Sequence, residues 1–349
     1  MTRPVRAARL AAAVERIVAA GADDRAMRAQ VLGAIERFVP FDAYAFLLTD
    51  PSSTVGCSPV ADVPDLASLP ALIRLKYLTS TNRWTGLPSR GCATLQQVTN
   101  GRPEASLLWR EHLSGLGIHD VFSGVYADRF GCWGFLDLWR TTRFDDDEVA
   151  ALAGAGHAIT HLLRRVQAAA FVRGNASQQL HRPGALVLSP TLEVRAQTPQ
   201  TQDWLASLVP PESGRGPVPA SAYNVAAQLL AIESGVDAHP AQARVHLGDG
   251  AWLTLRADRL AGTERAERDI VVTMEMSSPA ERRDVFSRSH GLTARENELL
   301  DRLAEGADTR TAAHRMTISE HTVQDHMKSI FLKTSTSSRR ELLAATGGG

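Results

Sequence analysis

Hydrogen-bonding side chains recur at helical spacing near the C-terminal end of the chain. His321, Asp325 and Lys328 project to one side of a helix at 100° per residue, and Gln324 lies on the flank of that side. An imidazole, a carboxylate, an ammonium and an amide on one exposed face can exchange hydrogen bonds with base edges in the major groove of DNA. The alternative is that they form the solvated face of an ordinary amphipathic helix.

The same stretch supplies the element that would position these groups. Ser319 is a favourable N-cap, because its hydroxyl can accept a hydrogen bond from a free backbone N–H at the start of a helix. A helix is therefore expected from Glu320. The side opposite the polar groups is apolar and must pack on other elements. It consists of Val323, Met327, Ile330 and Phe331.

Cap signals predict three more helices around this one. A capping box at 293–296 opens a helix that ends at Gly306, where a residue without Cβ can turn left-handed. Asp308 caps a second short helix, and residues 316–318 form the tight turn into the helix of the polar groups. A second capping box at 338–341 opens the last helix. Four short helices of this size suit a small DNA-binding unit.

Four segments of the sequence then point to a known family: LTARENELL, RLAEG, ISEHTVQDHMKSIF and SSRREL. In this order and spacing they resemble the DNA-binding domain of LuxR-type transcriptional regulators. The resemblance implies an all-α, four-helix helix-turn-helix domain over residues 291–349. Its partner would be double-stranded DNA, with RNA polymerase as a further candidate.

The resemblance also implies roles for individual residues. Gln324, Asp325 and Lys328 stand where the family reads base edges, and Arg310, Thr322 and Lys333 stand where it holds phosphates. The full candidate DNA-binding set is Arg310, Ser319, His321, Thr322, Gln324, Asp325, Lys328, Lys333 and Arg339.

Four departures from the family pattern bear on stability and on DNA binding. The family usually has a basic residue at Gln324, glycine at Thr317, isoleucine at Ala312 and an apolar-small-apolar trio at 334–336. A residue other than glycine at a positive-φ turn costs about 1 kcal/mol. Losing the apolar trio should loosen the last helix. We therefore expect a domain of reduced stability.

Length and charge limit the class of protein. The chain has 349 residues, 44% of them hydrophobic, and a net charge of zero, which suits a globular protein of two or three domains. A neutral chain is not a general nucleic-acid binder. The positive charge gathers locally, since the stretch 310–340 holds six basic residues against two acidic ones, a balance of +4. The six are Arg310, Arg315, Lys328, Lys333, Arg339 and Arg340.

Cysteine, lysine and hydropathy exclude several alternatives. Three scattered cysteines, Cys57, Cys92 and Cys132, form no metal-binding pair and indicate a reducing, cytoplasmic location. No window is long and apolar enough to span a membrane. The lysines are Lys76, Lys328 and Lys333 alone, so no Gly-Lys-Ser/Thr phosphate loop exists, which excludes the ATPase-fused branch of these regulators.

The segment after an N-terminal helix (1–21) is similar to GAF domains over residues 22–173. Helices are predicted at 5–20, after Asp24, at 66–79 and at 104–113, and the acidic residues 145–147 are expected to open a further long helix. A strand is predicted at 43–49, and strands 121–126 and 132–139 are predicted to form a hairpin. Such an α/β domain binds small molecules in a cup or dimerises. The candidate lining is Tyr44, Tyr77, Trp84, Phe122 and Trp133, although aromatic side chains are also common in cores.

A second unit, 184–278, resembles a PAS-like α/β fold. Strands are expected at 185–188, 192–196, 243–247, 252–260 and 270–277, and helices at 198–208 and 221–232. A polar break at 174–183 separates it from the first unit, a Pro/Gly-rich loop runs over 210–219, and Gly248–Gly250 form a hairpin turn. No cofactor is expected, because the unit contains no cysteine and its histidines are isolated from one another. A linker helix at 279–290 leads to the DNA-binding domain.

No catalytic constellation appears in the chain. Neither G-x-S-x-G nor H-E-x-x-H occurs, so neither an enzyme nor a metal site is expected. The interpretation is an α+β multidomain transcription regulator, homodimeric, whose sensor domains bind a small effector or dimerise. Two alternatives remain: an acyl-homoserine-lactone receptor, and an interaction module whose degenerate helix-turn-helix no longer binds DNA.

Overall fold

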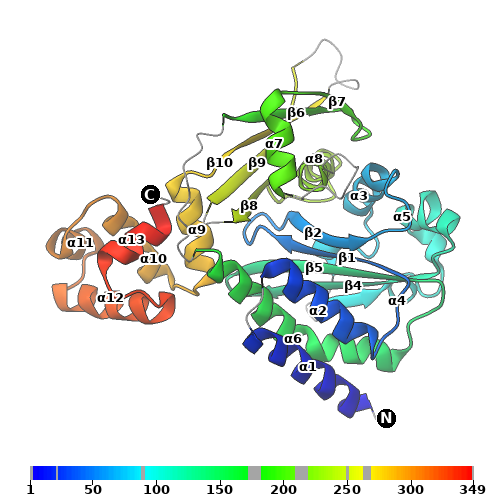
Figure 1. Cartoon of the computed structure of the whole chain (residues 1–349), viewed down its shortest axis with the longest axis horizontal. Coiled ribbons are helices and arrows are strands. Elements are labelled where there is room, and N and C mark those ends of the chain that lie inside the picture. The colour runs from blue at the N-terminus through cyan, green and yellow to red at the C-terminus, as the bar shows by residue number, and fades with distance from the viewer. Residues whose placement is uncertain are drawn as a thin grey trace.

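The computed structural model describes residues 3–20, 23–87, 91–171, 182–208, 219–248, 251–261 and 269–347. Two five-stranded antiparallel sheets are followed by a group of helices at the C-terminal end (Figure 1). The predicted polar break, the Pro/Gly-rich loop and the hairpin turn at Gly248–Gly250 lie largely outside the described residues. None of the helices in these ranges has the length and apolarity needed to cross a membrane.

The first sheet has the strand order β2-β1-β5-β4-β3. Its strands are β1 (Ala43–Thr49), β2 (Gly56–Asp62), β3 (Cys92–Thr94), β4 (Asp120–Asp128) and β5 (Gly131–Arg140). The predicted strand β1 and the β4–β5 hairpin are confirmed. The two edge strands were not predicted, because β3 is very short and β2 contains Pro59, a residue that sheets accept at an edge.

Three helices pack together on one side of this sheet: α1 (Arg3–Ala20), α2 (Asp24–Glu36) and α6 (Asp146–Ala169) (Figure 1). Asp145 opens α6 with a capping box to Glu148, so the acidic cluster at 145–147 caps a helix as predicted. The predicted cap of α2 was wrong by one residue. Asp23 accepts the Ala26 N–H, whereas Asp24 lies in the first turn and pairs with Arg28.

Short helices cover the other side of the first sheet: α3 (Leu69–Leu78), η1 (Trp84–Gly86), α4 (Leu95–Val98), η2 (Pro103–Ala105), α5 (Leu107–Glu111) and η3 (Leu113–Leu116). The continuous helix predicted over 104–113 is divided here into three pieces. Ser106 makes the first break, because it ends η2 in extended backbone and caps α5 through the Trp109 N–H. His112, with φ −138° and ψ −62°, makes the second break.

The second sheet repeats the strand order of the first, as β7-β6-β10-β9-β8. Its strands are β6 (Gly184–Leu188), β7 (Val194–Gln197), β8 (Gln242–Gly248), β9 (Ala251–Arg259) and β10 (Ile270–Met276), with helices α7 (Pro199–Leu208) and α8 (Ala220–Glu233). The strands and helices predicted for this unit are all present, with boundaries within two residues.

Helix α8 joins the two sheets. It is buried on all sides, with Ala222, Val225, Ala226 and Ala227 fully inaccessible, as expected of a helix that is apolar all round. It packs on β9 and β10 of its own sheet and on α3 and β2 of the first domain. The two sheets and the helices packed on them therefore share one continuous core.

The C-terminal helices follow a connecting helix, α9 (Pro279–Ser289). They are α10 (Ala294–Ala304), α11 (Thr309–Met316), α12 (Glu320–Thr334) and α13 (Arg339–Gly347). Their core is continuous with Phe171 after α6, Trp252 on β9 and Phe286 on α9. The Phe171 and Trp252 rings stack with their centroids 4.8 Å apart. The last four helices thus pack on α9, and α9 in turn contacts the rest of the chain around Phe171 and Trp252.

Candidate nucleic-acid interface

The N-cap residue Ser319 determines where helix α12 begins. The Ser319 hydroxyl accepts the Thr322 N–H at 3.1 Å and also lies 2.9 Å from the Thr322 hydroxyl. The predicted start at Glu320 is confirmed. The Thr293–Glu296 capping box and the Asp308 cap open α10 and α11 in the same way, so the order and limits of the helices follow from local hydrogen bonds.

The apolar side of α12 holds the helix in place. Val323 and Ile330 are fully buried, and Met327 and Phe331 pack at the edge of the same core. The helix lies against α10 and α11, whose buried faces carry Leu299 and Ala312. A helix anchored along one side in this way presents its opposite side in a fixed orientation.

That opposite side forms an exposed polar row, here called the outward stripe: His321, Gln324, Asp325 and Lys328. The side chains of His321, Asp325 and Lys328 are 84%, 56% and 73% exposed. Asp325 lies between the imidazole of His321 and the ammonium of Lys328, with His321 Nε2 at 3.6 Å and Lys328 Nζ at 3.4 Å. Exposed pairs of this kind are worth about 0–1 kcal/mol, so a ligand can replace them easily.

The turn before α12 has the conformation that the sequence suggested. Thr317 adopts φ 56° and ψ 46°, the left-handed region, and caps the end of α11. The Ile318 N–H donates to the Ala313 carbonyl at 3.0 Å and completes the turn. A β-branched threonine stands where the backbone favours glycine, and the turn is strained as a result.

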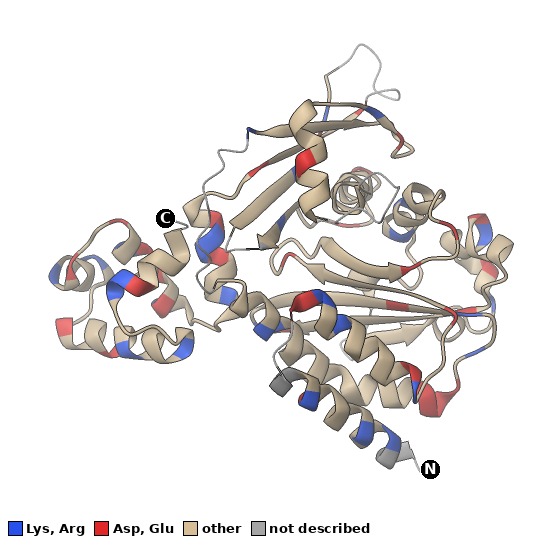
Figure 2. Ribbon diagram, viewed as in Figure 1, with Lys and Arg blue, Asp and Glu red and all other residues tan. Residues whose placement is uncertain are grey.

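The basic residues of this domain, blue in Figure 2, fall into two groups: those without an ion pair and those whose side chains are bonded to other residues. Arg310 and Arg340 are exposed and form no ion pair within the described residues. Arg315 pairs with Glu305 at 3.0 Å, and Arg339 donates to the Leu303 carbonyl at 3.2 Å. Of the cations predicted to contact DNA, Arg310 and Lys328 are therefore the most open.

Lys333 belongs to the second group, because it binds Glu296. Its Nζ lies 2.6 Å from one Glu296 oxygen and 2.8 Å from the other, and Ser329 donates to the same carboxylate. Burial alone would raise the pKa of Glu296, but the hydrogen bonds from Lys333, Ser329 and Thr293 lower it to about 2. Sequence reasoning recognised Glu296 as half of a capping box and missed this second role. The pair joins α12 to the start of α10.

The end of α12 replaces the family's apolar trio by hydrogen bonds. The buried Thr334 hydroxyl donates to the Ile330 carbonyl at 2.9 Å and contacts the Thr336 hydroxyl at 2.8 Å. Leu342 of α13 is fully buried. The Arg282 guanidinium on α9 donates to the carbonyls of Ala345 and Thr346 at the end of α13, where a cation is favoured.

The predicted ligand-binding aromatics separate into two sets. Tyr77 and Trp84 line a cavity of about 690 Å³ beside the first sheet. Tyr44 and Phe122 lie on the other face of that sheet, because each pairs with Leu138 in neighbouring strands while Ala45 and Asp137 pair on the cavity side. Trp133 is fully buried and does not border the cavity.

Sequence reasoning missed the charged residues of the cavity wall, which are the buried Lys76 and Asp137 and the more exposed Arg25 and Asp62. A signal was present, since Lys76 is a rare lysine in an arginine-rich chain and falls within a predicted helix. No group of three metal-ligating side chains occurs in the described ranges.

Comparison with known proteins identifies the C-terminal domain. Residues 290–345 match the family model for bacterial regulatory proteins of the luxR family, about one sixth of the chain. No curated protein matches the sequence. The last four helices are therefore a LuxR-type helix-turn-helix, the DNA-binding domain of a transcription regulator.

Proposed function

We propose that the protein is a cytoplasmic, sequence-specific transcription regulator that inserts α12 into the major groove. The observation that carries the proposal is the outward stripe, which offers donors and acceptors for base edges on a helix whose other side is buried. Thr322 at the capped N-terminus and the open cation Arg310 flank the stripe and would contact phosphates.

The N-terminal part acts as a sensor in this proposal. The first domain would be GAF-like and the second PAS-like, binding a small molecule or dimerising to control the helix-turn-helix. Two antiparallel sheets of matching strand order and the cavity beside β1 support this assignment. A homodimer would present two copies of α12 to half-sites about 34 Å apart, one turn of DNA. RNA polymerase would then be contacted by the DNA-bound dimer.

A salt titration of DNA binding tests the proposal. Genomic fragments that bind the full-length protein are selected first, and affinity for one of them is then measured between about 50 and 200 mM salt. We expect log affinity to fall linearly with log salt, because each phosphate contact releases counterions. A random duplex of equal length is the control and should bind at least about a thousandfold more weakly. Failure to select any fragment at low salt would favour the interaction-module alternative.

A further inference from the structure

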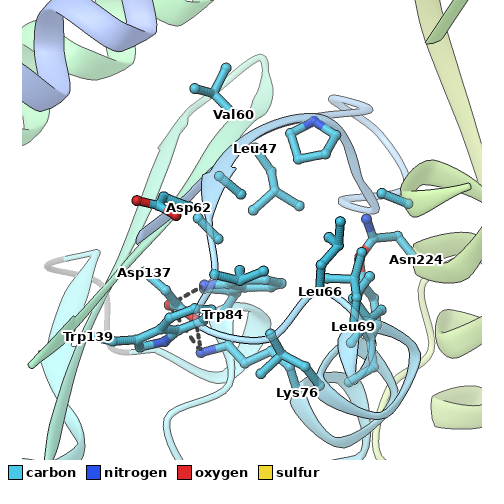
Figure 3. Close-up of a pocket in the computed structure, with 18 of the residues that line it drawn as sticks. Leu47, Val60, Asp62, Leu66, Leu69, Lys76, Trp84, Asp137, Trp139 and Asn224 are labelled. Atoms are coloured by element: carbon cyan, nitrogen blue, oxygen red, sulfur yellow. Dashed lines mark hydrogen bonds and ion pairs between the residues drawn. The ribbon is translucent and has the colours of Figure 1, made fainter. Parts of the chain in front are cut away.

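The cavity beside the first sheet belongs to both N-terminal domains. Its walls come from β1 and β5, from α3 and Trp84, and from α8 of the second domain. Asp137 and Trp139 lie across it from Asn224 (Figure 3). Its volume of about 690 Å³ is far larger than the water-sized voids of a well-packed interior and falls in the range of ligand pockets.

The lining is mostly apolar. Leucine, alanine and valine side chains from β1, β2 and α3 supply most of it, and the rings of Trp84 and Trp139 add flat surface. Leu66, at the exposed connection between β2 and α3, is 40% exposed and borders the cavity. An apolar molecule entering there would bury surface against these side chains, which favours binding.

The buried charges of the cavity wall neutralise each other. Lys76 Nζ lies 2.9 Å from Asp137 Oδ2 and also donates to the Asn82 carbonyl and the Ser123 hydroxyl, each at 3.0 Å. These three partners use the three protons of the ammonium. An anionic group at this buried end would therefore find no free donor on Lys76, and its desolvation there would be uncompensated. The other two charged lining residues are less buried, since Arg25 is half-buried and Asp62 is exposed.

Asp137 differs from Lys76 because it keeps capacity to accept one more hydrogen bond. Its Oδ1 accepts from Ser123 at 2.6 Å, from Trp84 Nε1 at 2.9 Å and from Lys76 at 3.1 Å. Within the described residues its Oδ2 contacts Lys76 alone. A carboxylate oxygen accepts about two hydrogen bonds, so Oδ2 can take a donor from a ligand.

We infer that this cavity binds a neutral, largely apolar small molecule with one hydrogen-bond donor, and that the molecule bridges the two N-terminal domains. The inference rests on the proposed sensor function and specifies its ligand class and location. The bridge follows from α8, which contributes Ala220 and Asn224 to the wall. The same helix packs on β2 and α3, and Ser221 Oγ accepts the Ser58 N–H at 3.4 Å.

Three related fluorescent probes test the ligand class on the full-length protein. N-phenyl-1-naphthylamine is neutral and apolar and has one N–H, its N-methyl derivative lacks that donor, and 1-anilinonaphthalene-8-sulfonate adds a negative charge to the same skeleton. We expect saturable binding of the first probe at one site. The sulfonate should bind at least about tenfold more weakly, because its charge is buried without a partner, and the N-methyl derivative several-fold more weakly. Equal affinities for all three probes would overturn the ligand class.

Matched variants test the location. Ala29 on α2 is exposed at the rim of the cavity, so Ala29→Phe adds volume there without disturbing the core, while the neighbouring Gln30→Phe points elsewhere and is its control. Ala220→Phe, or the smaller Ala220→Leu if the first does not fold, fills the cavity from the second domain. We expect at least a fivefold loss of probe binding in the Ala29 and Ala220 variants and none in the control.

The outcomes separate this inference from the proposed function. Loss of probe binding in the Ala29 variant alone would contradict the bridge between domains, and no loss in either variant would place the probe elsewhere. DNA affinity of the ligand-free protein is measured in parallel. Intact DNA binding together with a failed probe result overturns the cavity assignment only, whereas absent DNA binding counts against the regulator proposal.

Discussion

Arg244 on β8 and Asp50 directly after β1 form a bidentate, buried ion pair between the units of the two sheets. Arg244 Nε lies 2.6 Å from Asp50 Oδ2, and Nη2 lies 2.7 Å from Oδ1. The remaining nitrogen, Nη1, contacts Asp284 of α9 at 2.7 Å. Burial opposes ionisation of Asp50, but the hydrogen bonds from Arg244 hold its pKa below its usual value. One guanidinium thus connects β8 and the end of β1 to α9, the helix that leads into the DNA-binding domain.

Replacing Arg244 should destabilise the chain strongly. Arg244→Met leaves the fully buried Asp50 carboxylate without its partner, which costs about 3–5 kcal/mol. Urea unfolding followed by tryptophan fluorescence measures the loss. The control is Arg195→Met, which breaks an exposed pair with Glu193 and should cost at most about 1 kcal/mol. Similar effects of the two substitutions would mean that the buried pair does not join the domains.

Thr317→Gly should stabilise the C-terminal domain. The substitution relieves the left-handed strain at φ 56° and is expected to gain about 1 kcal/mol. Thr311→Gly, in the first turn of α11, is the control and should act in the opposite direction, because glycine weakens a helix. The thermal unfolding midpoints of the two variants, compared with that of the wild type, measure both effects. A lower midpoint for Thr317→Gly would show that the turn is not strained.

The Glu296–Lys333 pair should make stability depend on acid pH. The pKa of Glu296 is lowered from an ordinary 4.5 to about 2 in the folded protein. The stability that this carboxylate contributes is therefore present above pH 4.5 and is lost as pH falls towards 2. Its size is on the order of 3 kcal/mol.

Glu296→Gln keeps an acceptor for the capping box but removes the titration. Urea unfolding of the wild type and the variant at pH 6, 5, 4 and 3 should therefore show the difference between them shrinking as pH falls. A difference that stays constant over this range would rule out the pair as the cause.

Lys328→Ala should weaken binding to a selected DNA site by about 1–3 kcal/mol and leave the fold unchanged, because it removes a donor from the outward stripe. Fluorescence anisotropy at fixed salt measures the loss. The comparison is Val323→Ala, which empties a fully buried position and should cost roughly 1–3 kcal/mol of folding stability while affecting DNA only indirectly. Unchanged affinity of Lys328→Ala would contradict the orientation proposed for α12.

Asp325→Ala should reduce the discrimination between cognate and random DNA. A carboxylate that faces DNA either accepts a hydrogen bond from a cytosine amino group or repels phosphates. Its removal should raise affinity for random DNA and reduce the ratio between cognate and random sites. Anisotropy titrations on both duplexes give this ratio. Weaker binding to both would make Asp325 a structural residue, acting through its contacts with His321 and Lys328.

The sequence alone determined the helix-turn-helix and most elements of both sheets. Ser319, Thr293 and Asp308 cap helices as predicted, since a cap bonds to a backbone N–H a few residues away. The periodicity of Val323 and Ile330 likewise depends only on local helix geometry, and it placed the outward stripe correctly. Such signals are readable from the sequence because they depend on local helix geometry and on hydrogen bonds between residues a few positions apart.

The tertiary structure decided everything that depends on residues distant in sequence. Tyr44 and Phe122 point away from the cavity because strand pairing fixes which face each residue occupies, and one strand's pattern does not reveal its partner. Lys333 meets Glu296 across 37 positions, and Arg244 meets Asp50 across 194. The cavity has the same origin: α8 of one domain closes over the sheet of another, and only the packed chain brings their side chains together.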